Sequence, residues 1–224
     1  MSDSSTSQPT NPLRVGLLLF PGFQALDAFG PIDCLNVLSR TQTLTLSILS
    51  HTLDPVSTRS PFNPDAIAQS VVPTHTFSNA PPLDVLLVPG GQGTRCLDTD
   101  PIKSAIKFIA DVHPSLKYLV TVCTGSGLVA QSGVLDGRRA TTNKMGFAEV
   151  KRWRSQVDWV AKARWVVDGN IWTSSGVSAG IDVTLAWMEA VYGEEIATNI
   201  ANWTEYRRSE EASEDPFAEL YGLS

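Results

Sequence analysis

Histidine and cysteine are scarce in this chain, with three residues of each among 224. Cys34, Cys96 and Cys123 have neither the spacing of metal ligands nor the density of a disulfide scaffold, so we expect reduced thiols in a cytoplasmic protein. The predicted site accordingly contains no metal, and no cofactor is expected.

A long apolar run and an excess of basic residues are also missing. No run approaches the roughly 20 residues of a membrane span. The net charge of −6 argues against nucleic acid or an anionic membrane as a partner. Residues 1–12 have neither a basic start nor an apolar stretch, so we interpret them as a disordered lead-in rather than a signal peptide.

What is present describes one α/β domain over residues 13–209, followed by an acidic, loosely held tail over 210–224. Strands are predicted at 13–20, 43–49, 84–88, 118–122, 140–142, 157–160, 163–167 and 171–174. Helices are predicted at 26–38, with Pro31 expected only near its first turn, and at 101–112, 128–131, 147–153, 180–192 and 194–203. The alternation predicts a doubly wound, mostly parallel sheet sandwiched by helices, with an irregular stretch at 54–82 that holds one hairpin around 67–72.

The most informative stretch runs from Tyr118 to Ala130. Its apolar strand is followed at once by Cys123, then by small residues that include Gly125 and Gly127, and then by a helical pattern. This order is typical of a nucleophile elbow, in which a sharp turn lifts one side chain above the sheet edge. There the helix N-terminus would stabilise a thiolate. The alternative is a buried structural cysteine.

Two other loops are expected at the same edge, because the carboxyl ends of parallel strands meet there. Asp27 follows the first strand, and Gly90 and Gly91 follow the strand that ends at Val88. Separately, the aspartate could serve the helix N-terminus and the glycines a tight turn. Together with Cys123 they place an acid, a flexible backbone with free amide hydrogens and a thiol side by side, which favours chemistry.

A histidine base for the cysteine is not evident. His113 precedes the Tyr118 strand and is expected at the opposite end of the sheet from Cys123. His51 could reach the correct edge, and His75 lies in the irregular stretch, but neither has a recognisable context. The sequence therefore predicts no Cys–His dyad.

Five motifs in a fixed order carry a family resemblance. They are Leu-Leu-Phe-Pro-Gly-Phe with Leu-Asp27-Ala-Phe-Gly30-Pro31, Val88-Pro-Gly-Gly91, Val-Cys123-Thr-Gly-Ser, Gly137-Arg-Arg-Ala-Thr-Thr142 and Ser175-Gly-Val-Ser-Ala-Gly-Ile-Asp182. Over roughly residues 13–203 the chain resembles the ThiJ/PfpI superfamily, whose fold is flavodoxin-like. Within it, the chain is most similar to isocyanide hydratases, which share the aspartate and the Cys-Thr-Gly elbow, whereas DJ-one-like glyoxalases and chaperones carry glutamate.

The resemblance implies a small-molecule enzyme, usually a homodimer, that adds water to an isocyanide and forms an N-substituted formamide. Cys123 would attack as a thiolate to give a thioimidate, and Asp27 would deliver the proton and direct water. Backbone amides near Gly90, Gly91 and Thr124 would stabilise the developing charge, and the Thr124 hydroxyl could hold substrate or water. The alternatives are glyoxalase-like conversion of a 2-oxoaldehyde, or a non-catalytic cysteine redox sensor.

One position departs from the superfamily pattern. Many members have Thr-Thr-His after the elbow helix, where this chain has Asn143. Asparagine can orient a neighbour but cannot act as a base near neutral pH. Asn143 is therefore predicted to be a supporting group, which weakens the glyoxalase alternative.

Overall fold

The computed structural model describes residues 13–223, and its centre is a seven-stranded sheet in the order β10-β11-β7-β6-β1-β2-β5. The strands are β1 (Leu13–Leu18), β2 (Leu44–Ser50), β5 (His75–Thr76), β6 (Val85–Val88), β7 (Tyr118–Thr121), β10 (Trp165–Asp168) and β11 (Ile171–Ser174). Only the β10–β11 pair is antiparallel within this sheet. The mostly parallel α/β sheet expected from the sequence is confirmed.

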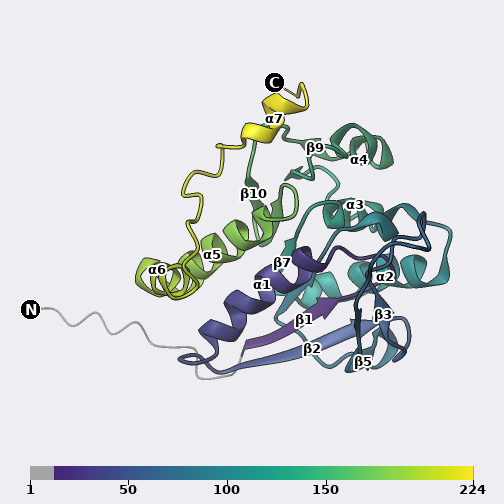
Figure 1. Ribbon diagram of the computed structural model, residues 1–224, viewed down its shortest axis with the longest axis horizontal. Helices are drawn as coiled ribbons and strands as arrows, with labels where there is room; N and C mark the ends of the chain where they lie inside the picture. The colour runs from purple at the N-terminus through teal and green to yellow at the C-terminus, as the bar shows by residue number, and fades with distance from the viewer. Residues whose placement is uncertain (1–12, 224) are drawn as a thin grey trace, which may run out of the picture.

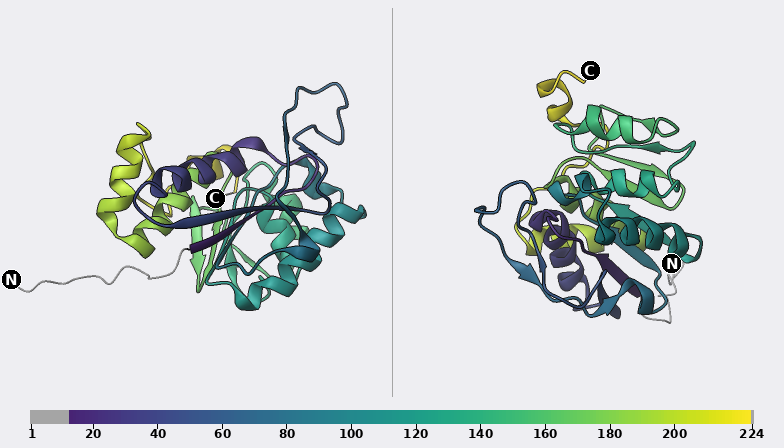
Figure 2. Two further views of the ribbon diagram at one scale, coloured as in Figure 1. Left: turned by 90° about the horizontal axis from the view of Figure 1, so that it is seen from below. Right: turned by 90° about the vertical axis from the view of Figure 1, so that its right-hand side faces the viewer.

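Helices cover both faces of the sheet (Figures 1 and 2). On one face α1 (Ala25–Leu38), α5 (Ala179–Tyr192) and α6 (Glu194–Trp203) pack together. On the other lie α2 (Asp100–Val112) and α3 (Gly125–Gln131), with α4 (Phe147–Trp153) against α3. Short 3₁₀ turns are η1 (Phe77–Asn79), η2 (Gln92–Arg95) and η3 (His113–Ser115). None of the helices described in residues 13–223 is both long and apolar enough for a membrane crossing.

The central strands are continuous apolar runs because both of their faces are covered. All four residues of β6 are buried, as are five of the six residues of β1. Strands buried on two sides lose the apolar–polar alternation of a half-exposed strand. This burial fixes the ends of β1, β6 and β7, from which the functional loops leave.

Three details of the fold differ from the sequence expectations. The hairpin near residues 67–72 is instead the antiparallel pair β3 (Val56–Ser57) and β4 (Ser70–Val71). The strand at 140–142 is β8 (Arg139–Ala140), which pairs with β9 (Asp158–Trp159) away from the main sheet. Pro31 lies inside α1 rather than in its first turn. The helix accommodates Pro31 at the cost of one hydrogen bond, because proline has no N–H to donate to the carbonyl oxygen of Asp27 four residues earlier.

The acidic C-terminal segment contains a helix that the sequence analysis did not predict. It ends in α7 (Pro216–Leu220), capped by Asp215, whose carboxylate is buried beside the ammonium group of Lys144. The contact between Lys144 and Asp215 joins segments far apart in the sequence, so the composition of the C-terminal segment does not reveal it. The predicted lead-in at 1–12 lies outside the described residues.

Candidate active site

Cys123 stands on a strained turn between β7 and α3. Its φ of 58° lies in the left-handed region, which few residues other than glycine adopt. Gly125 makes the turn possible, because a Cβ at that position would lie 2.3 Å from the carbonyl oxygen of Val88. The strand, sharp turn and helix predicted from the sequence are present.

Asp27 lies in the first turn of α1 and is buried beside this cysteine. Its Oδ2 accepts a hydrogen bond of 3.0 Å from the backbone N–H of Gly90. Its Oδ1 is buried and has no hydrogen-bond partner among the described residues. Burial raises the pKa of Asp27 to about 7, although the Gly90 amide and the Cys123 thiol both lower it. The carboxyl can therefore gain or lose a proton near neutral pH.

The thiol of Cys123 differs from the expected resting thiolate. Burial first, and the negative charge of Asp27 second, raise its pKa above the ordinary range. The backbone N–H groups of Thr124 and Val177 and the side chain of Thr124 lower this pKa by smaller amounts. These contributions of the amides are smaller than that of desolvation, so the resting form is the thiol. Val177 was not among the predicted site residues, although the 175–182 motif contains it.

The glycine loop after β6 packs tightly against the other two segments, but its amides are not free. The Gly90 N–H is bonded to Asp27, and the Gly91 N–H donates to Oγ1 of Thr124 at 3.1 Å. A Cβ on Gly90 would lie 2.5 Å from the Thr124 nitrogen and 3.0 Å from Oδ2 of Asp27. The expectation of free amides here is wrong. The amides that lower the pKa of the Cys123 thiol are instead those of Thr124 and Val177.

Asn143 braces two loops near the cysteine. Its Oδ1 accepts a 2.9 Å hydrogen bond from the Gly146 amide. Its Nδ2 lies so close to Gly176 that a Cβ there would be 2.4 Å away. The preceding Thr142 donates to the carbonyl oxygen of Cys123 at 2.9 Å. Asn143 thus adjoins the site through its neighbours.

A buried ion pair fixes the loop that brings Val177 to the sulfur. Nε of Arg164 donates to Oδ2 of Asp182 at 2.8 Å, and Nη2 of Arg164 donates to Oγ of Ser178 at 3.1 Å. The Arg164 carbonyl also accepts from the amide of Ser175 at 2.8 Å. Loop residues 175–178 are therefore held from both sides.

The histidines lie elsewhere. His51 is exposed and bonded to Ser104, His75 is bonded to Thr74, and His113 opens η3 on the far side of β7 from the elbow. Within the part of the chain that the structure describes, no three His, Cys, Asp or Glu side chains gather as a metal ion would require.

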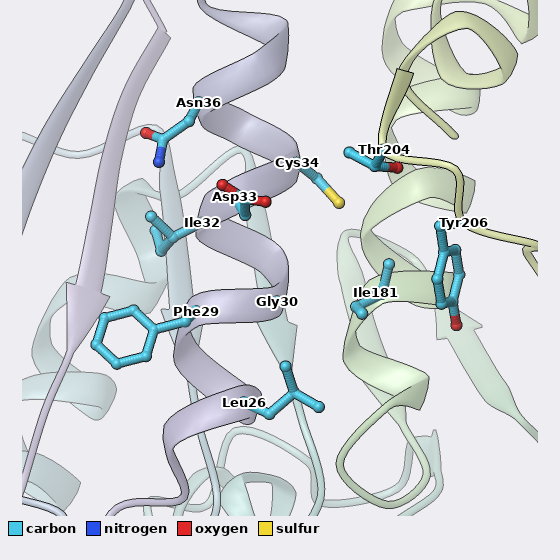
Figure 3. A pocket seen from close by; sticks show the side chains of 10 residues that line it. All are labelled: Leu26, Phe29, Gly30, Ile32, Asp33, Cys34, Asn36, Ile181, Thr204 and Tyr206. Carbon is cyan, nitrogen blue, oxygen red and sulfur yellow. The ribbon is translucent and has the colours of Figure 1, made fainter. Parts of the chain in front are cut away.

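An apolar hollow beside α1 is separate from this site. Its volume is about 400 Å³, and Figure 3 shows Leu26 and Cys34 pointing from α1 toward Ile181 and Thr204. Burial raises the pKa of the Cys34 thiol to about 12, and in the described part of the chain no buried carboxyl oxygen without a partner accompanies it as Oδ1 of Asp27 accompanies Cys123. Neither Asp27 nor Cys123 lines this hollow.

Known proteins share both the sequence pattern and the fold. Residues 13–190 match the DJ-1/PfpI family. The chain is 34% identical to the isonitrile hydratase of Pseudomonas putida over 194 residues, which is 87% of this chain and 78% of that protein. It is 26% identical to the transcriptional regulator GbdR of Pseudomonas aeruginosa, covering 90% of this chain but 53% of that protein. A ThiJ/PfpI family protein from Pseudomonas syringae superposes with a TM-score of 0.72 at 26% identity, covering 93% of this chain and 81% of that one.

Proposed function

This chain belongs to the DJ-1/PfpI family, and we propose that it hydrates isocyanides, also called isonitriles, to N-substituted formamides. The observation that carries the proposal is that Asp27 and Cys123 are buried together and influence each other's pKa, while one oxygen of Asp27 has no hydrogen-bond partner in residues 13–223. This chemistry needs one acid–base group and one thiol. The similarity to an isonitrile hydratase supports the same reaction.

The first step joins the sulfur to the terminal carbon of the isocyanide. Because the resting group is a thiol, the Asp27 carboxylate takes its proton as the sulfur attacks, and returns it to that carbon. The product is a thioimidate, with a new C–S bond, a new C–H bond and a C=N double bond. The amides of Thr124 and Val177 stabilise negative charge on the sulfur during this transfer.

The second step releases the product. Asp27, again a carboxylate, removes a proton from water as the oxygen adds to the thioimidate carbon, and passes this proton to the nitrogen. The C–S bond of this adduct then breaks as the C=O bond of the formamide forms, and Asp27 transfers the proton of the adduct's hydroxyl group to the sulfur. One water has been consumed, and the formamide leaves with enzyme unchanged. Asp27 is the only acid–base side chain that these steps require, so no histidine is needed.

The test is to incubate the protein with an aryl isocyanide in ¹⁸O-labelled water and to look for labelled formamide. We expect Cys123→Ser to abolish turnover and Cys96→Ser, a change at another free cysteine, to leave it intact. Mass spectrometry should detect the thioimidate on the Cys123 peptide. Equal turnover in wild type and Cys123→Ser would refute the cysteine mechanism.

A ligand- or redox-sensing role without turnover is the second candidate, because the chain also resembles the regulator GbdR over part of that protein. The buried thiol with its raised pKa disfavours a peroxide sensor, since sensor cysteines are accessible thiolates. Oxidation of Cys123 by dilute peroxide at a rate well above that of Cys96 would favour sensing. A parallel assay with methylglyoxal tests the glyoxalase alternative.

The proposed enzyme acts as a cytoplasmic homodimer on a small-molecule substrate. The dimer follows from the family resemblance, and the cytoplasm from the three unpaired thiols of the described chain. Light scattering after size-exclusion chromatography measures the mass in solution. A monomer at micromolar concentration would contradict the dimer.

A further inference from the structure

Three hydrogen-bond donors converge on the carbonyl oxygen of Gly91, beside the elbow. The backbone N–H of Thr94 donates to it at 3.2 Å, and the hydroxyl of Thr94 donates to it at 2.8 Å. The hydroxyl of Thr124 lies 3.3 Å from the same oxygen. A carbonyl oxygen has two lone pairs, so it cannot accept well from all three donors.

Thr94 is the stronger competitor for this oxygen. Its hydroxyl contact of 2.8 Å has the usual length for a hydrogen bond between two oxygens, whereas the 3.3 Å of Thr124 exceeds the range of roughly 2.5–3.0 Å. Thr94 is also fully buried, so bulk water does not reach its hydroxyl. With its amide and its hydroxyl on Gly91, Thr94 uses both lone pairs.

The oxygen of the Thr124 hydroxyl is itself an acceptor. Its Oγ1 accepts from the Gly91 N–H at 3.1 Å, and it lies 3.1 Å from Oγ1 of Thr94 in a geometry that fits Thr94 as the donor. The hydrogen of the Thr124 hydroxyl has one acceptor of suitable geometry in residues 13–223, the Gly91 carbonyl. Because Thr94 holds that carbonyl, the hydrogen remains free for another neighbour of Thr124.

The neighbour that uses this hydrogen is Cys123. It directly precedes Thr124 in the elbow, and both residues are buried. The side chain of Thr124 lowers the pKa of the Cys123 thiol, against the larger effect of burial. A hydroxyl lowers a thiol pKa when it donates to the thiolate, because the hydrogen bond stabilises the charged form.

We infer that Thr94 is a positioning residue, which occupies the Gly91 carbonyl and thereby leaves the Thr124 hydroxyl to donate to the sulfur of Cys123. In the proposed reaction this donation stabilises the sulfur whenever it carries negative charge, as it attacks the isocyanide and as it leaves the adduct. The catalytic part of the inference rests on the proposed function, whereas the part that concerns the thiol does not.

The experiment measures two rates: alkylation of Cys123 by iodoacetamide at pH 8, followed by mass spectrometry of its peptide, and kcat/KM for an aryl isocyanide. Thr94→Val keeps the shape of the side chain and removes the hydroxyl, so the Thr124 hydrogen turns to the Gly91 carbonyl. Loss of a hydrogen bond to the thiolate should raise the thiol pKa by about one unit, so both rates should fall by about 10-fold. Thr94→Ser keeps the hydroxyl and should retain both rates.

Thr99→Val is the matched control. Thr99 also donates to a carbonyl three residues earlier, that of Cys96 at 2.7 Å, but it is exposed and outside the site. Both rates should therefore equal those of wild type. In a Thr124→Val background, Thr94→Val should cause no further loss, because the hydroxyl through which Thr94 acts is absent.

Faster alkylation in Thr94→Val would overturn the inference, because the substitution would then only loosen the elbow and expose the thiol. Unchanged rates, or a further loss in the Thr124→Val background, would overturn it as well. Should wild type hydrate no isocyanide while alkylation slows in Thr94→Val, the proposed function fails and the effect of Thr94 on the thiol stands. Hydration by wild type with both rates unchanged in Thr94→Val leaves the function standing and refutes the inference.

Discussion

The backbone N–H of Gly90 donates to Oδ2 of Asp27 at 3.0 Å, and this one hydrogen bond orients the carboxyl group. With Oδ2 so held, Oδ1 is buried and has no hydrogen-bond partner in residues 13–223. The glycine also allows the approach, since a side chain there would meet both Thr124 and Asp27. In the proposed reaction, this unpartnered oxygen is the atom that accepts the proton of the Cys123 thiol.

The activity should depend on pH through Asp27. If its carboxylate is the base, kcat/KM rises by about tenfold per pH unit below pH 7 and levels off above the pKa of about 7. Asp27→Asn should lower kcat/KM by at least about 100-fold. Asp33→Asn, at an exposed position in the same helix, should leave the profile unchanged. A rate that falls as the pH rises from 5 to 8 would contradict the role of Asp27 as a base.

The same carboxyl should make the protein less stable at higher pH. The folded pKa of Asp27 is about 7, above the ordinary 3.8, so the folded state holds the proton more tightly than the unfolded state. The free energy of unfolding should fall as the pH rises from about 4 to about 7. The total loss is at most roughly 4 kcal/mol. Urea unfolding of Asp27→Asn should show higher stability than wild type at pH 8 and little difference at pH 4.

Asp84 provides a control of opposite sign. Hydrogen bonds from Arg14, together with Lys117, hold the pKa of Asp84 below its usual range. Its contribution to stability is present above the unfolded pKa and is lost as the pH falls, so Asp84→Asn should destabilise the protein at pH 8. Destabilisation of both variants at pH 8 would mean that the buried, charged carboxylate of Asp27 does not lower the stability of the folded protein, and that Asp27 has a structural role.

Substitution of Gly90 by alanine should damage the site strongly, although it adds only one methyl group. An alanine Cβ would be 2.5 Å from the Thr124 nitrogen, a main-chain atom that cannot move without displacing the elbow. We expect kcat/KM for an aryl isocyanide to fall by about 10-fold or more, and stability to fall by about 1–3 kcal/mol. Gly146→Ala is the matched control, because its Cβ would have no neighbour nearer than 3.5 Å. Equal effects of the two changes would refute the steric argument.

The elements that the sequence predicted well are those with a strong local pattern. The elbow is one, because a β-branched run, a cysteine and two glycines follow one another directly. The meeting of Asp27 with Cys123 was also predictable, since both follow parallel strands that end at one edge. The two-residue strand β5 has too few residues for a periodicity.

Other features of the site depend on burial and on distant partners. The raised pKa of Cys123 comes from desolvation, which no local pattern reports. Val177 lies in a loop that Arg164 and Asp182 hold, and these two residues meet through tertiary structure. The contact of Lys144 with Asp215 is likewise formed between distant segments. The family motif at 175–182 was the one signal that could have identified the Val177 loop.

The buried pair of Lys144 and Asp215 should show strong coupling. Lys144→Met leaves a buried carboxylate without its cation, and Asp215→Asn leaves a buried ammonium group, so each should cost about 3–5 kcal/mol of stability. The double variant should be less damaged than the sum of the two. Urea unfolding of the four proteins gives the coupling energy. Additive losses would mean that the two charges do not stabilise one another and that α7 is held by its apolar contacts.

Asn143 tests whether the departure from the wider superfamily alters the chemistry. Its side chain accepts a hydrogen bond from the Gly146 amide and packs closely against Gly176, in the loop whose Ser175 carbonyl accepts from the Cys123 amide, so Asn143→Ala should chiefly raise KM for an aryl isocyanide. Its kcat should stay within about 3-fold, because the residue makes no bond to the reacting atoms in the proposed steps. Loss of the acceptor for the Gly146 amide should cost about 1–3 kcal/mol in stability.

Asn143→His should then separate the two enzymatic alternatives. A histidine at this position would add a base to the site. The proposed hydration does not require such a base, whereas the glyoxalase-like conversion of 2-oxoaldehydes that the family resemblance offers as an alternative does. We expect no gain with the isocyanide and a rise in any trace activity with methylglyoxal, measured as the ratio of the two rates in wild type and both variants. Suppose instead that Asn143→Ala abolishes kcat for hydration while the fold and the pH profile stay unchanged. Asn143 would then act on the substrate itself, and a mechanism carried by Asp27 and Cys123 alone would have to be abandoned.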